Sequence, residues 1–467
     1  MSWVNLAATI GLAVTYPEMA RELGELRRSQ WRSRGEVEQA SWRALQATLR
    51  YAYDFVPFYR TKFDRAGVSV EDIRVPADLL AIPLTTKQEL REALAAQWPL
   101  STAVPSHQAS RASTTGSSGE PFVFPIDRAA KDLRMAAVFR NIEWYGHRLG
   151  DRNARLWGRP ERPPDLTGWG RGVEAFKRKA LGRRLDIFTH DRSQPAASLV
   201  NEATLASWTS QLQSQDFKAL DGYVNALVLL ARYMLDTGQT GIHCQAVVTG
   251  AEYLSPPARE LLERAFGCPV YNRYGSSEAG FIAHECGRSP NHKLHINAEV
   301  LWLEFLGDGQ PVASGELGEI VLTEFTNRAM PLIRYRTNDV GVPADARESC
   351  PCGRGLPLLN SVEGRVDDLF YLPGGEVLVS HVWHEIFADQ DFVAAFRVTQ
   401  HRQDFVEVEI VPKHEQLPAS RYSALQEWVR GFLPGCTVIW NQVDEIRPGA
   451  GGKLRSSRSL VASPSGF

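Results

Sequence analysis

Between about residues 130 and 345, short apolar runs alternate with segments that have the spacing of amphipathic helices. The expected strands are residues 153–157, 219–223, 246–248, 270–274 and 319–323, and the expected helices are residues 198–213, 226–237 and 256–266. Apolar runs separated by helices are typical of α/β domains, in which crossover helices make much of the sheet parallel. We therefore predict an α/β fold with mixed and parallel sheet.

The composition places the chain among globular proteins and argues against a nucleic-acid partner. It has 467 residues, of which 43% are hydrophobic and 23% charged, which is enough for a sizeable core and more than one domain. The net charge is −2 and the basic residues are dispersed. Because a nucleic-acid-binding protein needs a concentrated basic surface, we expect no nucleic-acid partner.

Cysteine usage and hydropathy indicate the compartment. Six cysteines without regular spacing do not describe a disulfide framework, so we expect a cytoplasmic protein. No segment has the roughly 20 apolar residues of a membrane-spanning helix. The apolar residues 3–16 are expected to form a helix that docks on the body of the protein, and contact with a membrane or a partner stays open as the alternative.

Two domains are expected. Residues 1–364 form the large one, with a helical layer over about residues 1–60, because residues 18–53 have helical spacing. After residue 364 the pattern changes to strand, helix, strand, helix and strand, which predicts a small α+β domain over residues 365–467. Its expected elements are residues 369–379, 381–387, 404–411, 420–432 and 436–440.

A run of hydroxyl side chains and glycines occupies residues 111–121, directly before a strand-like Phe-Val-Phe. Hydroxyl groups and closely approaching glycine backbone are suited to surround a polyphosphate. The spacing is not that of a Walker loop, and a strand rather than a helix follows. Such a run alone is more often a plain flexible connection. The residues that we predict to bind phosphate are Ser113, Thr114, Thr115, Gly116, Ser117, Ser118 and Gly119.

Further motifs follow this run in a fixed order. Residues 249–252 (Thr-Gly-Ala-Glu) and 271–278 (Tyr-Asn-Arg-Tyr-Gly-Ser-Ser-Glu) stand at the ends of expected strands, where ligands of open α/β sheets gather. Residues 333–341, 364–368 and 451–455 complete the set. Each motif alone has an ordinary structural explanation, whereas the ordered combination predicts a nucleotide site.

The ordered set resembles the adenylate-forming superfamily, and within it the phenylacetate-CoA ligase branch that includes CapK-like proteins. The resemblance extends from the aromatic stretch at residues 51–59 to the Gly-Gly-Lys of residues 451–453. It implies a large N-terminal domain that binds ATP and the acid, and a small C-terminal domain that rotates between two half-reactions.

The resemblance also assigns roles to matching residues. It implies that residues 113–119 hold the β- and γ-phosphates of ATP, that Glu278 holds Mg²⁺, and that Asp339 accepts hydrogen bonds from the ribose hydroxyls. Two positions depart from the family pattern: Glu120 stands where many relatives have lysine, and Asn338 where they have glycine. The residues implied to frame the adenine are Gly250, Ala251, Glu252, Asn272, Arg273 and Tyr274, with Gly275 and Ser276 completing that motif.

Lys453 is the expected catalytic residue. A carboxylate that attacks an α-phosphate meets like charge and builds negative charge in the transition state, which a positioned cation stabilises. Arg365 and Asp367 stand at the domain junction, where a hinge is expected, and Arg365 is expected to reach the ribose or a phosphate. A solvated tail lysine is the alternative for Lys453.

A structural zinc site is expected from Cys350 and Cys352, which form a tight Cys-x-Cys turn, together with Cys286 upstream. Three thiolates and one imidazole make a closed tetrahedral site. The resemblance gives His295 as the fourth ligand, and His292 is the alternative. The remaining Cys244, Cys268 and Cys436 are interpreted as isolated core thiols.

The resemblance implies AMP-forming ligation of a carboxylic acid, in which an acyl-adenylate forms first and its acyl group is then transferred to a thiol. Coenzyme A is the default acceptor by resemblance. Transfer to an amine or amino sugar, as the CapK likeness allows, and a non-catalytic nucleotide-binding homologue are the alternatives. The sequence leaves the acid and the oligomeric state open, a homodimer included. Residues that flank the nucleotide motifs and line either the acid pocket or the core are Trp157, Tyr223 and Phe281.

Overall fold

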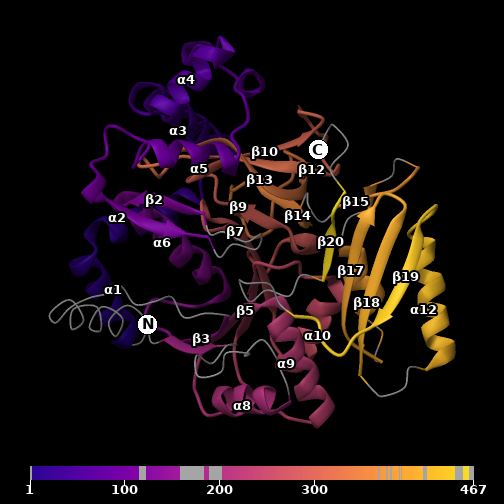
Figure 1. Ribbon diagram of the computed structural model, residues 1–467. Coiled ribbons are helices and arrows are strands. Elements are labelled where there is room, and N and C mark those ends of the chain that lie inside the picture. Colours follow the sequence, from indigo (N-terminus) through magenta and orange to yellow (C-terminus); the bar gives the residue numbers. More distant parts are fainter. Residues whose placement is uncertain are drawn as a thin grey trace.

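The fold is given by a computed structural model (Figure 1). It describes residues 3–114, 122–157, 184–188, 202–365, 369–374, 377–378, 381–388, 390, 392–413, 418–447 and 456–461. The predicted phosphate-binding residues 115–119, Asp367 and the expected catalytic Lys453 lie outside these ranges, and so does the Trp157 side chain. The predictions for them therefore remain predictions.

A 12-stranded sheet forms the centre of the molecule, in the order β11-β10-β12-β13-β14-β9-β8-β7-β6-β5-β3-β4. The strands β4, β3, β5, β6 and β7 run parallel, and every pairing from β7 to β11 is antiparallel. The bounds are β3 Asn153–Trp157, β4 Arg184–Phe188, β5 Ala219–Tyr223, β6 Ala246–Gly250, β7 Val270–Ser276, β8 Gly280–Glu285, β9 Leu294–Ile296, β10 Leu301–Gly307, β11 Gln310–Pro311, β12 Gly318–Glu324, β13 Leu332–Pro343 and β14 Leu358–Arg365.

The predicted α/β class is confirmed, and the expected strands and helices of this region are present with bounds shifted by a few residues. Helices cover the parallel part of the sheet, and buried side chains of α8, α9 and α10 pack with those of β3, β5, β6 and β7. The apolar runs are short because each strand is buried by helices that cross over it. The bounds are α6 Arg128–Ile142, α8 Glu202–Gln213, α9 Val224–Thr237 and α10 Pro256–Phe266.

Helices α3 and α4 lie over the antiparallel part of the sheet, whereas α1 and α2 pack against α6 (Figure 1). Buried residues of α3 and α4 share one core with strands β8, β9, β10, β12, β13 and β14. Local sequence sets the helix ends: Ser33 and Thr86 form capping boxes with Glu36 and Glu89, and α4 ends at Gly67 in the left-handed region. The bounds are α1 Trp3–Thr15, α2 Pro17–Ser29, α3 Arg34–Phe55, α4 Pro57–Ala66 and α5 Lys87–Ala96.

The first helix docks on the body, as the sequence predicts. Asn5 donates from Nδ2 to the Leu149 carbonyl and to Asp151 Oδ1, both at 2.9 Å. The backbone at Gly150 has a φ of +89°, and a Cβ there would lie 2.9 Å from the Val4 carbonyl oxygen. Glycine at position 150 therefore permits the close approach of α1. Among the described residues, no helix is long and apolar enough to cross a membrane.

A hairpin and short 3₁₀ helices complete the described part of the large region. Strand β1 (Ala109–Ser113) pairs antiparallel with β2 (Val123–Asp127), and the predicted phosphate loop connects them. The structure places Ser113 in β1, so the first part of the hydroxyl-rich run is strand. Short 3₁₀ helices fill connections at η1 Val70–Asp72, η2 Pro76–Ala81, η3 Ser106–Gln108, η4 Glu143–Tyr145 and η5 Pro290–His292.

The C-terminal part has its own sheet, in the order β19-β18-β17-β20, and its own core. Figure 1 shows it beside the large sheet, and Lys413 Nζ reaches Asp236 Oδ2 of α9 at 2.9 Å. The prediction missed β17, which lacks alternation, and β20, which consists of Ser-Arg-Ser. Whether this part is a mobile domain remains a prediction. The bounds are β15 Phe370–Tyr371, β16 Val377–Leu378, α11 His381–Ala388, β17 Val393–Arg402, β18 Phe405–Pro412, α12 Ala419–Gly431, β19 Thr437–Gln442 and β20 Ser457–Ser459.

His147, buried between η4 and β3, makes the fold sensitive to acid. Burial lowers the pKa of His147 to about 4, from an ordinary value of 6.5. Because the unfolded chain binds the proton more readily, the free energy of unfolding falls as the pH drops from 6.5 towards 4. Between about pH 7 and pH 5, we expect the free energy of unfolding to fall by roughly 2 kcal/mol more in the wild type than in His147→Leu.

Urea unfolding at the two pH values measures this difference. The exposed His107, replaced by leucine in the same way, is the matched control and should leave the pH dependence unchanged. An equal loss of stability in His147→Leu and the wild type would contradict the prediction.

Candidate active site

The predicted nucleotide motifs meet at the carboxyl ends of β6 and β7. These strands are parallel neighbours, with Gly250 opposite Arg273 in the register. The segment that follows β6 therefore lies beside the end of β7. The carboxyl edge of parallel strands is the usual ligand-binding edge of an α/β sheet.

Glu252 links the end of β6 to the beginning of a helix. Its Oε2 accepts a hydrogen bond of 2.8 Å from the backbone N–H of Asn225, in the first turn of α9. A carboxylate is favourable there because the first turn of a helix has unpaired N–H groups. Ala251, with a φ of 67°, turns the chain between the strand and Glu252. The expected contact of these residues with adenine remains a prediction.

Arg273 crosses β6 to reach Asp221 on β5. Its Nη1 donates to Asp221 Oδ2 at 2.9 Å, and its Nη2 donates to Oδ1. A Cβ on Gly250 would lie 3.0 Å from the Arg273 Nε, so glycine leaves the path of the side chain open. The guanidinium also lies 4.9 Å from the centre of the Phe281 ring. In this structure Arg273 is therefore part of an ion pair on the sheet, and a contact with adenine is untested.

Tyr274, Asp339 and Arg365 form one network from three strands. The Tyr274 hydroxyl donates to Asp339 Oδ2 at 2.6 Å, and Arg365 Nε lies 3.7 Å from Asp339 Oδ1. Burial, and next to it the Asp339 carboxylate, raise the pKa of Tyr274 well above its ordinary value, so the hydroxyl keeps its proton and donates. Asn338 has a φ of 61°, in the left-handed region that asparagine tolerates, so the backbone suits either asparagine or the glycine that the resemblance implies.

Glu278 lies in a second network, beside the first. It is 6% exposed, and its Oε1 accepts from the Tyr335 hydroxyl at 3.2 Å and lies 2.9 Å from Lys87 Nζ. Burial raises the pKa of Tyr335, and the Glu278 and Asp339 carboxylates raise it further. The charge of Asp339 therefore reaches Tyr335, which connects the two networks.

Gly275 and Ser276 shape the turn that carries Glu278. A Cβ on Gly275 would lie 2.6 Å from the Gly280 carbonyl oxygen, so only glycine allows β7 and β8 to approach there. Ser276 Oγ accepts a hydrogen bond of 3.1 Å from the Ala279 N–H. These contacts hold the tight turn between the parallel and antiparallel parts of the sheet.

Lys87 is a site residue that sequence analysis missed, because no motif surrounds it. It begins α5, two residues after Thr85. The Thr85 N–H donates to the Arg334 carbonyl of β13, and the Thr85 carbonyl accepts from the Arg336 N–H, both at 2.9 Å. The pairing of Thr85 with β13 places the start of α5 so that the Lys87 ammonium group reaches Glu278.

The same lysine lies beside the base of the predicted phosphate loop. Lys87 Nζ is 5.7 Å from the centre of the Phe122 ring. Phe122 and Thr114 close the base with two hydrogen bonds of 3.0 Å, from the Thr114 N–H to the Phe122 carbonyl and from the Phe122 N–H to Thr114 Oγ1. The lysine therefore lies near both Phe122, at the base of the loop, and Glu278, the predicted magnesium ligand.

The predicted zinc ligands also come together. One ligand atom from each of Cys286, His295, Cys350 and Cys352 lies within 4.8 Å of the others. Cys286 and Cys350 have sulfurs 3.5 Å apart, and Cys352 Sγ lies 3.3 Å from His295 Nε2. The alternative ligand His292 is outside this group, and its side chain is 59% exposed.

The cysteine-histidine group adjoins the N-terminal helical layer. Trp144 of η4 lies with its ring centre 5.5 Å from that of His295, and its Nε1 donates to Gln30 Oε1 at 2.9 Å. Arg354 donates from Nε to the same oxygen at 2.9 Å, and the Gly355 N–H donates to the Gln30 carbonyl at 3.0 Å. The loop of Cys350 and Cys352 is thereby fixed to the end of α2.

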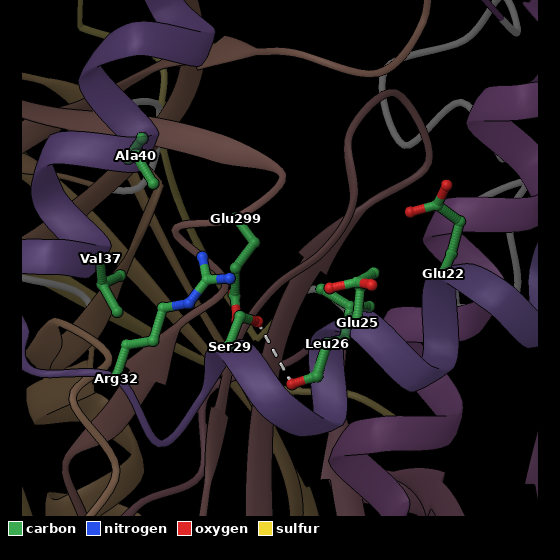
Figure 2. Close-up of a pocket in the computed structure, with 9 residues that line it drawn as sticks. Glu22, Glu25, Leu26, Ser29, Arg32, Val37, Ala40 and Glu299 are labelled. Carbon is green, nitrogen blue, oxygen red and sulfur yellow. Dashed lines mark hydrogen bonds between the residues drawn. The ribbon is translucent and has the colours of Figure 1, made fainter.

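A pocket of about 180 Å³ lies away from these networks, between α2 and α3 (Figure 2). Its carboxylates have partners: Glu299 accepts from Ser29 Oγ at 2.8 Å and from Arg140 at 3.0 Å, and Glu22 pairs with Arg21 at 2.7 Å. No predicted nucleotide residue lines it, so it is not the candidate site. The lining residues are Glu22, Glu25, Leu26, Ser29, Arg32, Val37, Ala40, Ser41 and Glu299.

Comparison with known proteins finds relatives of this chain. The chain is 28% identical to the phenylacetate-coenzyme A ligase of Escherichia coli over 361 residues, which cover 75% of this chain and 76% of the relative. The chain is a homologue of the phenylacetate-coenzyme A ligases. Protein CapK of Staphylococcus aureus is 33% identical over 124 residues, or 26% of each chain. No profile of a known protein family matches.

Solved structures of adenylate-forming enzymes share the fold. A 2-hydroxyisobutyryl-CoA ligase in the postadenylation state, in complex with R3-HIB-AMP, has a TM-score of 0.73 at 20% identity over 93% of this chain and 92% of the other. The amide bond synthetase McbA from Marinactinospora thermotolerans has a TM-score of 0.51 at 16% identity over 74% and 67%. The homology and the shared fold confirm the predicted superfamily and fold class. The roles of individual site residues remain predictions.

Proposed function

We propose that this phenylacetate-coenzyme A ligase homologue joins a carboxylic acid to coenzyme A in two steps with ATP. In the first, the acid attacks the α-phosphate and forms an acyl-adenylate and pyrophosphate. In the second, the thiol of coenzyme A attacks the acyl carbon and releases AMP. The observation that carries the proposal is the meeting of the Asp339 and Glu278 networks at the strand ends of a chain homologous to such ligases.

Asp339 is proposed to bind the ribose. A carboxylate has two oxygens that accept hydrogen bonds from neighbouring hydroxyls. Here the Tyr274 hydroxyl and Arg365 hold the carboxylate in place. Because Tyr274 is buried and keeps its proton, it orients Asp339 as an uncharged hydrogen-bond donor.

Glu278 is proposed to coordinate Mg²⁺. Its carboxylate oxygens are hard donors, and Tyr335 and Lys87 both contact Oε1. Bound Mg²⁺ would neutralise phosphate charge at this edge. Tyr335 orients the carboxylate from β13.

Lys87 is proposed to contact the phosphates of ATP. The resemblance implies a lysine at the end of the phosphate loop, where this chain has Glu120. Lys87 adjoins the base of that loop and reaches Glu278, and its side chain is 39% exposed, so its ammonium group is accessible. It would stabilise the charge that develops on the leaving pyrophosphate.

Lys453 is proposed to act at the reacting atoms during adenylation. Its ammonium group would contact both the attacking carboxylate and the α-phosphate, which lowers their mutual repulsion. The support for this role is the Gly-Gly-Lys motif near the C-terminus together with the homology.

The cysteine-histidine group is proposed to hold a structural zinc ion. In a tetrahedral site with Zn–S distances of about 2.3 Å, ligand sulfurs lie about 3.7 Å apart, and the observed 3.5 Å between Cys286 and Cys350 fits. Three thiols and one imidazole leave no position for a substrate. The ion would fasten the loop of residues 350–352 to β8 and β9, and thereby to α2 through Gln30.

An amine is the second candidate for the acceptor. The partial match to protein CapK and the fold shared with an amide bond synthetase support this alternative. AMP release with coenzyme A, compared with release by a panel of amines and amino sugars, separates the two. Release that depends on an amine and not on coenzyme A would replace the first proposal with the second.

The role of Lys453 is tested by acid-dependent exchange of pyrophosphate into ATP across a broad panel of carboxylic acids. We expect exchange in the wild type and a loss of about 100-fold or more in Lys453→Ala, because a transition-state contact is removed. Lys413→Ala, which removes an exposed ion pair with Asp236, is the matched control and should retain exchange. Equal exchange in Lys453→Ala and the wild type would contradict the assignment.

Replacement of Lys87 tests the phosphate contact. Lys87→Gln should lower the rate of pyrophosphate exchange by about 10-fold or more, and Lys87→Arg should restore part of it because the charge is retained. Thermal unfolding should differ little among these variants, since the side chain is partly exposed. Wild-type exchange in Lys87→Gln would rule out the proposed contact.

Metal analysis of the purified protein tests the zinc site. We expect one zinc per chain, and Cys350→Ser should lose the metal and unfold at a lower temperature. Cys436→Ser is the matched control, because Cys436 lies outside the group, and it should keep both. Protein that is folded and free of zinc without exposure to chelators would overturn this assignment.

A further inference from the structure

Cys244 and Cys268 form a second pair of neighbouring sulfurs, away from the predicted zinc ligands. Their Sγ atoms are 3.5 Å apart. The interpretation of these residues as isolated core thiols is therefore wrong. Their separation of 24 residues along the chain hides the contact from sequence analysis, because only the pairing of β6 with β7 brings them together.

The sheet holds this pair in place. Cys244 precedes β6 and Cys268 precedes β7, and these strands are parallel neighbours, with Val247 opposite Val270. The Val247 N–H donates to the carbonyl of Pro269 at 3.0 Å. The two sulfurs therefore lie at the amino edge of the strands, whereas the nucleotide motifs lie at the carboxyl edge.

Small oxidants can reach the pair. Both thiols are half-buried, and the residues that flank them in sequence, His243, Gln245 and Gly267, are exposed. The hydrogen bond from Cys244 lowers the pKa of Cys268, so Cys268 is the better nucleophile of the two. A reactive thiol beside a second thiol is the arrangement of a reversible oxidation site.

We propose that Cys244 and Cys268 form a reversible intramolecular disulfide when the protein meets a hydroperoxide. The Cys268 thiolate attacks the peroxide, its O–O bond breaks, and a sulfenic acid forms while the other oxygen leaves as alcohol or water. The Cys244 thiol then displaces water from that sulfenic acid, and the S–S bond closes. Two thiols are oxidised and one peroxide is reduced; a small thiol reductant reverses the change.

The disulfide would stabilise the β6-α10-β7 unit. A bond of about 2.05 Å requires the two sulfurs to approach by roughly 1.5 Å. The bond closes a loop that contains α10 and restricts the unfolded chain. Since the bond lies at the edge opposite the nucleotide motifs, we expect a higher unfolding temperature without a loss of the proposed activity.

Peptide mapping of the whole protein after treatment with hydrogen peroxide tests the proposal. We expect a cross-linked pair of peptides that contain Cys244 and Cys268, at a mass two hydrogens lower, which dithiothreitol removes. The unfolding temperature should rise by a few degrees in the wild type and stay constant in Cys244→Ser and Cys268→Ser. Cys436→Ser should cross-link as the wild type does.

A second measurement follows the intermediate. In Cys244→Ser the sulfenic acid has no partner, so a dimedone adduct should accumulate at Cys268 and be several-fold weaker in the wild type. Four outcomes would overturn the proposal: no cross-linked pair, cross-links confined to Cys286, Cys350 and Cys352, over-oxidised Cys268 in the wild type, or no adduct in Cys244→Ser. The pyrophosphate exchange assay does not depend on these measurements. Loss of exchange would therefore contradict the proposed ligase function without affecting the test of the disulfide.

Discussion

The hydrogen bond between Tyr274 and Asp339 requires that the large sheet curve strongly. In the order of the sheet, three strands separate β7 from β13, which is four strand spacings or about 19 Å in a flat sheet. The two side chains nevertheless meet at 2.6 Å. The short strand β9, which has three residues, and the irregular register between β13 and β14 leave room for this curvature. The curved sheet brings both motifs to one site.

The motifs are readable from the sequence because each needs particular residue types over a short stretch. Asn338 illustrates this, since its left-handed backbone favours asparagine or glycine at this position. Contacts that depend on pairing between distant segments are not readable. Lys87 reaches Glu278 only because Thr85 pairs with β13, and Arg273 reaches Asp221 only because glycine occupies position 250. The strands β17 and β20 were missed for a related reason, because their neighbours rather than an alternating pattern make them strands.

The proposed zinc site and the proposed nucleotide site depend on the same strands. Cys286 follows β8 and His295 lies in β9, between the strands that carry Tyr274 and Asp339. A metal that fixes β8 and β9 to the loop before β14 would therefore hold the curved part of the sheet in shape. The sequence predicted these ligands, but only the structure connects them to Trp144, Gln30 and the helical layer.

The central claim is that the carboxylate of the substrate attacks the α-phosphate of ATP. It is tested most directly with an acid that supports pyrophosphate exchange and carries ¹⁸O in its carboxyl group. After turnover with coenzyme A, mass spectrometry of the products locates the label. The account predicts one ¹⁸O atom in AMP, because the bridging oxygen of the acyl-adenylate leaves with the nucleotide. Label in inorganic phosphate, with ADP as the nucleotide product, would contradict it.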